Sequence, residues 1–266
     1  MPNITMWQAE RDALATLGLM ARAYELFDVP VDFPGESAPS HVLGLNIHAL
    51  IVDNADGDVL ALERNTIHAD GSPLQHGEQR ALRTAIARIS SKRPRQPTQS
   101  IEGYYRSSMF LIKGTTAEDF FNLGVTLYTS LEPCPYCASA LLVSRMKRVC
   151  YLIPDKTFGG AWTTLKAAYY PGDDTTYLQI GMAGSGSVFA EKVEQLRAKL
   201  ILKSDQLRAA KVRDTHLLDF CRDELKDAFD LIASAKAGDL SSTSAGEPRN
   251  ANTLAGLQRA IGMPVR

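Results

Sequence analysis

Two short motifs in this sequence combine residues that bind transition metals. One is His76-Gly77-Glu78, and the other is Pro133-Cys134-Pro135-Tyr136-Cys137. An imidazole nitrogen and two thiolates suit zinc, which prefers tetrahedral coordination by nitrogen and sulfur. Three protein ligands leave a fourth position for water, as a catalytic site requires, and bound zinc lowers the pKa of that water towards neutrality. We therefore predict that His76, Cys134 and Cys137 bind a zinc ion.

Glu78 is the candidate catalytic residue of the first motif. It follows His76 by two residues at the expected start of a helix, so the two side chains point in different directions and Glu78 stands beside the metal. A carboxylate there can take a proton from a bound water molecule and deliver it to a leaving nitrogen. The alternative is a structural zinc site, but such sites normally have four protein ligands, and no fourth ligand occurs at the usual spacing.

The apolar patterns around the motifs indicate alternating helices and strands that can bring the two motifs together. The expected elements are a helix at 5–27, a hairpin with strands at 47–52 and 59–62, a helix from His76, a strand at 125–129, a helix at 138–146 and a strand at 149–153. An insertion is expected at about 91–123, with a short strand at 109–112 and a short helix at 116–123.

The C-terminal third has a helical pattern without a further motif. We expect a helix at 187–202, an amphipathic stretch at 205–235, a flexible linker at about 236–250 and a short helix at 254–261. The predicted organisation is therefore a first domain over 1–200 and a helical C-terminal extension over 201–266.

The composition limits the class of protein. The net charge is −1, which gives no overall attraction to nucleic acid or to an anionic membrane. No segment has the roughly 18 uninterrupted apolar residues that a membrane helix needs, and no signal-like N-terminus is seen. The chain has 4 cysteines, too few for a disulfide scaffold, and Cys150 and Cys221 fit buried positions. We expect a cytoplasmic protein that does not contact a membrane.

The two motifs resemble those of the cytidine and deoxycytidylate deaminase superfamily, in which H-x-E is followed by P-C-x-x-C. The residues beside them are most similar to the branch that contains the tRNA-adenosine and guanine deaminases. Residues 130–137, Ser-Leu-Glu-Pro-Cys-Pro-Tyr-Cys, resemble its T-L-E-P-C-P-M-C closely, and residues 144–149 and 154–157 resemble its A-R-I-K-R and D-x-K-T-G features loosely. Gly77 replaces the usual alanine, the gap between the motifs is longer than in compact members, and the C-terminal extension matches none of the branch's features.

The resemblance implies a fold and a set of substrate contacts. The fold would be an α/β class, three-layer α/β/α sandwich of the cytidine deaminase type with a mixed sheet. Asn65 falls where this branch has a base-binding asparagine, and Ala49, Gly77 and Pro133 are expected to contact the substrate as well. Members of the branch commonly form dimers, so a homodimer is expected.

The function implied by the resemblance is that of a zinc-dependent hydrolase acting on C–N bonds. It would convert an exocyclic amine of a free nucleobase such as a purine, a nucleoside or a related small-molecule heterocycle into a carbonyl group with release of ammonia. Two alternatives stay open: adenosine deamination in tRNA or another RNA, and a deaminase-fold binding module in which the C-terminal helices are the working part.

Two further sets of residues have an ordinary explanation. The basic residues between Lys92 and Arg106, with Tyr104 and Tyr105 among them, fit a solvated loop better than a nucleic-acid contact. The histidines outside the motif have no ligand-like spacing and are expected at the surface or in the core: His41, His48, His68 and His216.

Overall fold

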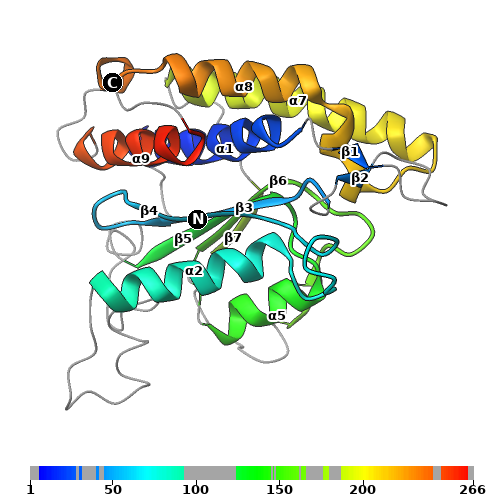
Figure 1. The fold of residues 1–266 in the computed structure, drawn as a ribbon. Helices are drawn as coiled ribbons and strands as arrows, with labels where there is room; N and C mark the ends of the chain where they lie inside the picture. The colour runs from blue at the N-terminus through cyan, green and yellow to red at the C-terminus, as the bar shows by residue number, and fades with distance from the viewer. Residues whose placement is uncertain are drawn as a thin grey trace, which may run out of the picture.

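A mixed sheet with strand order β4-β3-β5-β6-β7 forms the centre of this computed structural model (Figure 1). The described residues are 6–27, 30–31, 40–41, 45–92, 124–144, 146, 148–161, 163–165, 176–179, 187–241 and 247–262. The strands are β3 (His48–Asp53), β4 (Val59–Arg64), β5 (Val125–Leu131), β6 (Arg148–Ile153) and β7 (Thr176–Gln179). β3 pairs antiparallel with β4 and β5, whereas β5, β6 and β7 run parallel.

The sheet is covered on both faces because its central strands are apolar on both sides. In β3, Ala49 and Ile51 belong to one core, and Leu50 and Val52 belong to the other. This is the alternation expected of a strand with helices above and below it.

Helices α2 (Gly77–Lys92) and α5 (Pro135–Val143) cover the first face (Figure 1). The buried residues of α2 include Leu82, Ala85 and Ile89, which the sequence pattern predicts for this face. α5 begins at Pro135 rather than at the expected Ala138, because proline at the first helical position fits the φ angle of a helix and its missing N–H has no intrahelical partner there. The two helices that carry the motifs therefore lie in one layer.

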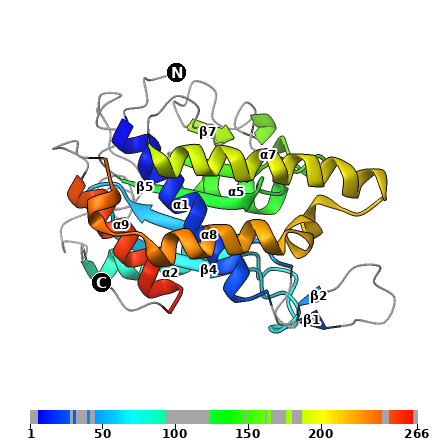
Figure 2. The ribbon, with the colours of Figure 1, turned by 90° about the horizontal axis from the view of Figure 1, so that it is seen from above.

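Helices lie on the other face as well, and apart from α1 they come from the C-terminal third of the chain (Figures 1 and 2). They are α1 (Met6–Glu25), α7 (Val188–Ala209), α8 (Arg222–Ser234) and α9 (Glu247–Ala260). α1 contacts β3 and β5, α7 contacts β6, and α9 contacts β4, whereas α8 packs on α1 farther from the sheet (Figure 1). The expected three-layer α/β/α fold is confirmed, and α7 and α9 complete its third layer with α1.

A buried ion pair joins α1 to the sheet. Arg148 of β6 donates hydrogen bonds to the carboxylate of Asp12, one of them at 2.7 Å to Oδ1. The hydroxyl of Tyr128 in β5 donates to the same Oδ1 at 2.6 Å. This shared acceptor fixes the register of α1 over the parallel strands.

The structure adds detail to two expectations about the C-terminal third. The stretch 205–235 is not one element, because α7 ends at Ala209, Lys211 has a left-handed φ of 62°, and a 3-10 helix, η2 (Asp214–Phe220), precedes α8. The expected linker is ordered at both ends: η3 spans Ala237–Asp239 and α9 begins at Glu247.

The two ends of the expected linker at 236–250 are ordered because their polar groups donate hydrogen bonds to a buried carboxylate. Glu10 of α1 accepts hydrogen bonds from the backbone N–H of Ser241 at 2.9 Å, from Asn250 Nδ2 at 2.9 Å and from Ser187 Oγ at 3.1 Å. A serine-rich composition is typical of a linker, but here it supplies donors to the core.

The remaining described elements are short strands β1 (Pro30–Val31) and β2 (Ser40–His41), which pair with each other. The strand expected at 109–112 and the helix expected at 116–123 lie outside the described residues. None of the described helices combines the length and the apolar character that crossing a membrane requires.

Candidate metal centre

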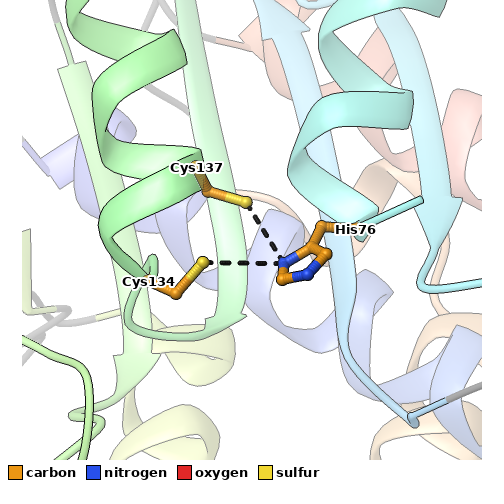
Figure 3. Close-up of side chains that lie close together, drawn as sticks. All are labelled: His76, Cys134 and Cys137. Carbon is orange, nitrogen blue, oxygen red and sulfur yellow. Dashed lines mark hydrogen bonds between the residues drawn. The ribbon is translucent and has the colours of Figure 1, made fainter. Parts of the chain in front are cut away.

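The three expected metal ligands converge between the first turns of α2 and α5 (Figure 3). His76 immediately precedes α2, Cys134 is the N-cap residue of α5, and Cys137 lies in the first turn of α5. The Nδ1 atom of His76 is 3.6 Å from the Sγ atom of Cys134 and 3.5 Å from that of Cys137. The sheet brings the motifs together, because α2 follows the β3–β4 hairpin and α5 follows the adjacent strand β5.

These residues fit a zinc ion in number, chemistry and spacing. One nitrogen and two sulfur atoms, one from each side chain, all lie within 4.8 Å of one another. The group has three members within the described part of the chain, and Glu78 is not among them. Three N/S ligands with no fourth are the set of a catalytic zinc centre rather than a closed structural one.

The electrostatics of the group favour thiolate at Cys134. The hydrogen bond from Cys137 lowers the pKa of Cys134 to about 4, against the opposing effect of burial, and the hydrogen bond with His76 acts in the same direction. The hydrogen bond between His76 and Cys134 raises the pKa of His76. The hydrogen bond between Cys137 and Cys134 raises the pKa of Cys137, which keeps its proton as the donor. A metal replaces these protons when it binds, since zinc ligands must be deprotonated.

Glu78 lies in the first turn of α2 and is almost fully buried, with 4% of its surface exposed. Burial raises its pKa to about 7, because desolvation disfavours the ionised form more than the backbone hydrogen bond stabilises it. A carboxyl group that ionises near neutrality is suited to taking up and releasing a proton. This environment differs from that of a surface acid at a helix start.

A cavity of about 550 Å³ opens onto two of the metal ligands, His76 and Cys134, and Glu78 and Asn65 also line it. Asn65 is 1% exposed, and its Oδ1 atom accepts a hydrogen bond from the N–H of Ile67 at 3.2 Å. That bond fixes the side chain in a tight turn at the end of β4. The cavity size is typical of a small-molecule site.

The other three expected substrate contacts are not among the described residues that line this cavity: Ala49, Gly77 and Pro133. Ala49 is fully buried in β3. A Cβ atom on Gly77 would lie 3.1 Å from the carbonyl oxygen of Ile47 and 3.4 Å from the backbone nitrogens of Ala49 and Asn65. Gly77 therefore packs α2 closely against the backbone beside it.

Several cavity residues have no signal in the sequence pattern. Tyr136 and Phe158 are exposed aromatic residues in the wall, and the Tyr136 ring stands edge-on to the His76 ring at 5.6 Å between centroids. The wall also contains His68 and His216, two of the histidines expected at the surface or in the core. Arg213 and Thr215 join them from the segment between α7 and α8. Tyr136 lies within the second motif, but no local motif marks the other residues, since only the packing of distant elements brings them to the site.

The comparisons with known proteins agree with the geometry of the metal centre. Residues 38–153 match the family model of the cytidine and deoxycytidylate deaminase zinc-binding region. A tRNA-specific adenosine deaminase of Aquifex aeolicus (strain VF5) is 25% identical over 139 residues, which are 52% of this chain and 62% of that protein. The match thus spans less than two thirds of that relative.

Two solved structures are also similar to parts of the chain. One comes from a study of A-to-I editing by tRNA:A34 deaminases at the wobble position of transfer RNA. It is 22% identical to this chain with a TM-score of 0.32, and the match covers 50% of this chain and 78% of that chain. The other is guanine deaminase from Bacillus subtilis, 22% identical, with a TM-score of 0.30, covering 59% of this chain and 80% of its own.

The metal-binding part of the chain can therefore be assigned. His76, Cys134 and Cys137 all fall within the matched residues and have the ligand types and spacing of a zinc site. Over residues 38–153, which are less than half of its length, the chain is similar to the cytidine and deoxycytidylate deaminase zinc-binding region.

Proposed function

We propose that this chain is a zinc-dependent hydrolytic deaminase. Its substrate would be a free nucleobase, a nucleoside or a related small heterocycle, whose exocyclic amine is replaced by a carbonyl oxygen with release of ammonia. One observation carries the proposal: the buried carboxylic acid Glu78 lines the same cavity of about 550 Å³ as His76 and Cys134, two members of the three-ligand N/S metal group.

Each residue has a defined role in this proposal. When zinc is bound it supplies a Lewis acid that makes a water molecule acidic near neutral pH. Glu78 accepts a proton from the attacking water and delivers it to the amine nitrogen, which leaves as ammonia. Asn65, whose Oδ1 accepts from the N–H of Ile67, would donate from its Nδ2 to the ring; its place in the cavity wall supports this role. Tyr136 and Phe158 offer aromatic faces and edges to a planar heterocycle.

A base within folded RNA is the alternative substrate, and one observation favours it. The relative from Aquifex aeolicus carries the name of a tRNA-specific adenosine deaminase. Binding to RNA depends mainly on cationic contacts with phosphates, whereas this chain has a net charge of −1. We therefore place the small heterocycle first and the RNA substrate second; a deaminase-fold binding module would lack turnover altogether.

The test is ammonia release by the zinc-loaded protein from a panel of free bases, nucleosides, nucleotides and tRNA, with Glu78→Ala beside the wild type. Release from small heterocycles that is absent in the variant supports the proposal. Release from tRNA alone would favour the RNA substrate. No release from any member of the panel, with zinc bound stoichiometrically, would contradict catalysis and favour the binding module. The expected homodimer can be checked on the same preparation by analytical ultracentrifugation.

A further inference from the structure

One part of the cavity wall comes from the C-terminal third of the chain. Arg213, Thr215 and His216 line the cavity that also contains Glu78 and the metal ligands His76 and Cys134. They lie between α7 and α8, at and just before the start of η2. No residue of this segment belongs to the matched range 38–153.

Asp214, between Arg213 and Thr215, anchors the segment. Its Oδ1 atom accepts hydrogen bonds from Ser204 Oγ at 2.9 Å and from Arg208 Nη2 at 3.2 Å. Its Oδ2 atom accepts from the N–H of Lys156 at 3.2 Å, in the loop after β6. Asp214 is 7% exposed, so these bonds are largely shielded from water. The segment is thus fixed both to α7 and to the loop beside the cavity.

Three acidic residues near Arg213 in the chain have other partners: Asp205, Asp214 and Asp219. Asp205 pairs with Arg208 at 3.0 Å and with Lys156 at 3.6 Å, and Asp214 pairs with Arg208 at 3.2 Å. Asp219 lies 3.3 Å from Nδ1 of His216. In the part of the chain that the structure describes, Arg213 has no acidic partner, although it is exposed at a cavity. A guanidinium in that position is available to an anion from solution.

Two further donors lie within the same wall. No hydrogen bond joins the hydroxyl of Thr215 to a described residue, and His216 is engaged at Nδ1 only, which leaves Nε2 for a ligand. Because Nδ1–H of His216 faces the carboxylate of Asp219, its Nε2 donates a hydrogen bond when the ring is protonated. A guanidinium, a hydroxyl and an imidazolium N–H together match the several acceptor oxygens of a phosphate group, which arginine binds in a bidentate manner.

We propose that Arg213, Thr215 and His216 form a subsite for the phosphate monoester of a small nucleotide, so that the substrate is a nucleoside monophosphate. This rests on the proposed function, because the base of that nucleotide is placed at the metal centre. A cavity of about 550 Å³ is of the size that binds a single small ligand. Three donors in one wall serve one phosphate, whereas an RNA substrate requires several phosphate contacts along a surface.

The first test measures binding without turnover. Calorimetric titration of the zinc-loaded protein compares inosine with its 5′-monophosphate and uridine with its 5′-monophosphate, which are deaminated products. The wild type should bind at least one monophosphate about 10- to 100-fold more tightly than its nucleoside, as expected for a charge-assisted contact. Inorganic phosphate should compete with that monophosphate.

Three variants locate the preference. Arg213→Gln should reduce the difference between nucleotide and nucleoside to less than about threefold, and Thr215→Val should reduce it by a smaller factor. Lys211→Gln is the matched control, since it removes one positive charge two residues away at a position outside the described cavity wall. It should leave the preference unchanged.

The outcomes separate this proposal from the proposed function. Phosphate-dependent binding that requires Arg213, without ammonia release from any substrate, would support the subsite and contradict the deaminase. Ammonia release with equal affinity for each nucleotide and its nucleoside, or no measurable binding of either monophosphate, would overturn the subsite. An effect of Arg213→Gln on tRNA binding alone would also overturn it and favour the RNA substrate.

Discussion

The carboxylate of Glu132, at the end of β5, holds the loop that follows β6: its Oε1 atom accepts a hydrogen bond from the N–H of Gly160 at 2.8 Å. Its Oε2 atom accepts from the N–H of Asp155 at 3.2 Å. Glu132 directly precedes the proline of the second motif, so one side chain ties the cysteine-bearing segment to the loop that carries Asp155 and Phe158 of the cavity wall. The role of Glu132 is therefore structural.

The first prediction concerns Gly159, which this arrangement encloses. A Cβ atom there would lie 2.2 Å from both the carbonyl oxygen of Asp155 and Oε2 of Glu132. Gly159→Ala should displace the loop and lower the unfolding free energy by about 1–3 kcal/mol, as overpacking does. Denaturant titration measures the loss. Gly238→Ala, where a Cβ atom meets nothing within 4 Å, is the control and should have little effect. Equal stability of the two variants would contradict this account.

A second prediction separates metal binding from catalysis. Glu78 is outside the ligand group, and Glu78→Gln keeps the shape of its side chain, so the variant should retain stoichiometric zinc. Its rate of ammonia release should fall by at least about 100-fold, because glutamine cannot transfer the proton. Cys134→Ala removes one of three ligands and should lose both. Metal analysis and the ammonia assay on the same preparations check this. An active, metal-free Cys134→Ala protein would overturn the assignment of the centre.

The third prediction concerns the pH dependence of stability at Asp155. Burial raises the pKa of its carboxyl group, although Oδ1 accepts bonds from the N–H groups of Thr157 at 2.8 Å and Phe158 at 3.0 Å. Because the folded state holds this proton more tightly than the unfolded state, ionisation costs stability. The cost is absent below the unfolded pKa of about 3.9 and complete above the folded pKa.

Asp155→Asn keeps the acceptor oxygen without the charge, so the variant should gain stability relative to the wild type as pH rises from about 3 towards 7. Unfolding midpoints measured at intervals over this range test the sign. A difference that does not change with pH, or that changes in the opposite direction, would show that Asp155 is not destabilised by ionising.

The fourth prediction concerns the ion pair between α1 and β6. The side chains of Arg148 and Asp12 are 1% and 6% exposed, so removing the carboxylate leaves a buried guanidinium without its main counter-charge. Asp12→Ala should cost about 3–5 kcal/mol of unfolding free energy. Glu25→Gln, on the same helix in an exposed pair with Arg22, should cost less than about 1 kcal/mol. If chemical denaturation showed equal losses of unfolding free energy for the two variants, burial would not be what makes the Arg148–Asp12 pair important.

The metal centre could be predicted because its ligands occur in two local motifs. His76 and Glu78 are two residues apart, Cys134 and Cys137 are one helical turn apart, and the strands beside them have clear apolar patterns. The three-layer fold could be predicted for the same reason and from the family resemblance. The roles of Glu78 and Asn65 remain proposals, supported by their place in the cavity wall.

The contribution of the C-terminal third could not be predicted in this way. Arg213 and His216 reach the cavity only because α7 ends at Ala209 and Asp214 anchors the following turn, and neither event has a sequence motif. The order at the two ends of the expected linker could not be predicted for a related reason. A serine-rich segment reveals its donors but not the buried Glu10 that accepts their hydrogen bonds, since that residue lies more than 200 positions earlier.

The position of α1 has a consequence for how this protein is made. Glu10 binds Ser241 and Asn250, and the helix packs against α8 and α9. A ribosome therefore releases a helix that is almost wholly buried in the finished protein long before the residues that cover it have been synthesised, and its full burial must wait for the last tenth of the described chain. During that interval the nascent protein exposes the faces of α1 that α8 and α9 later cover, so its yield in cells should depend on chaperones that shield α1 until α9 emerges.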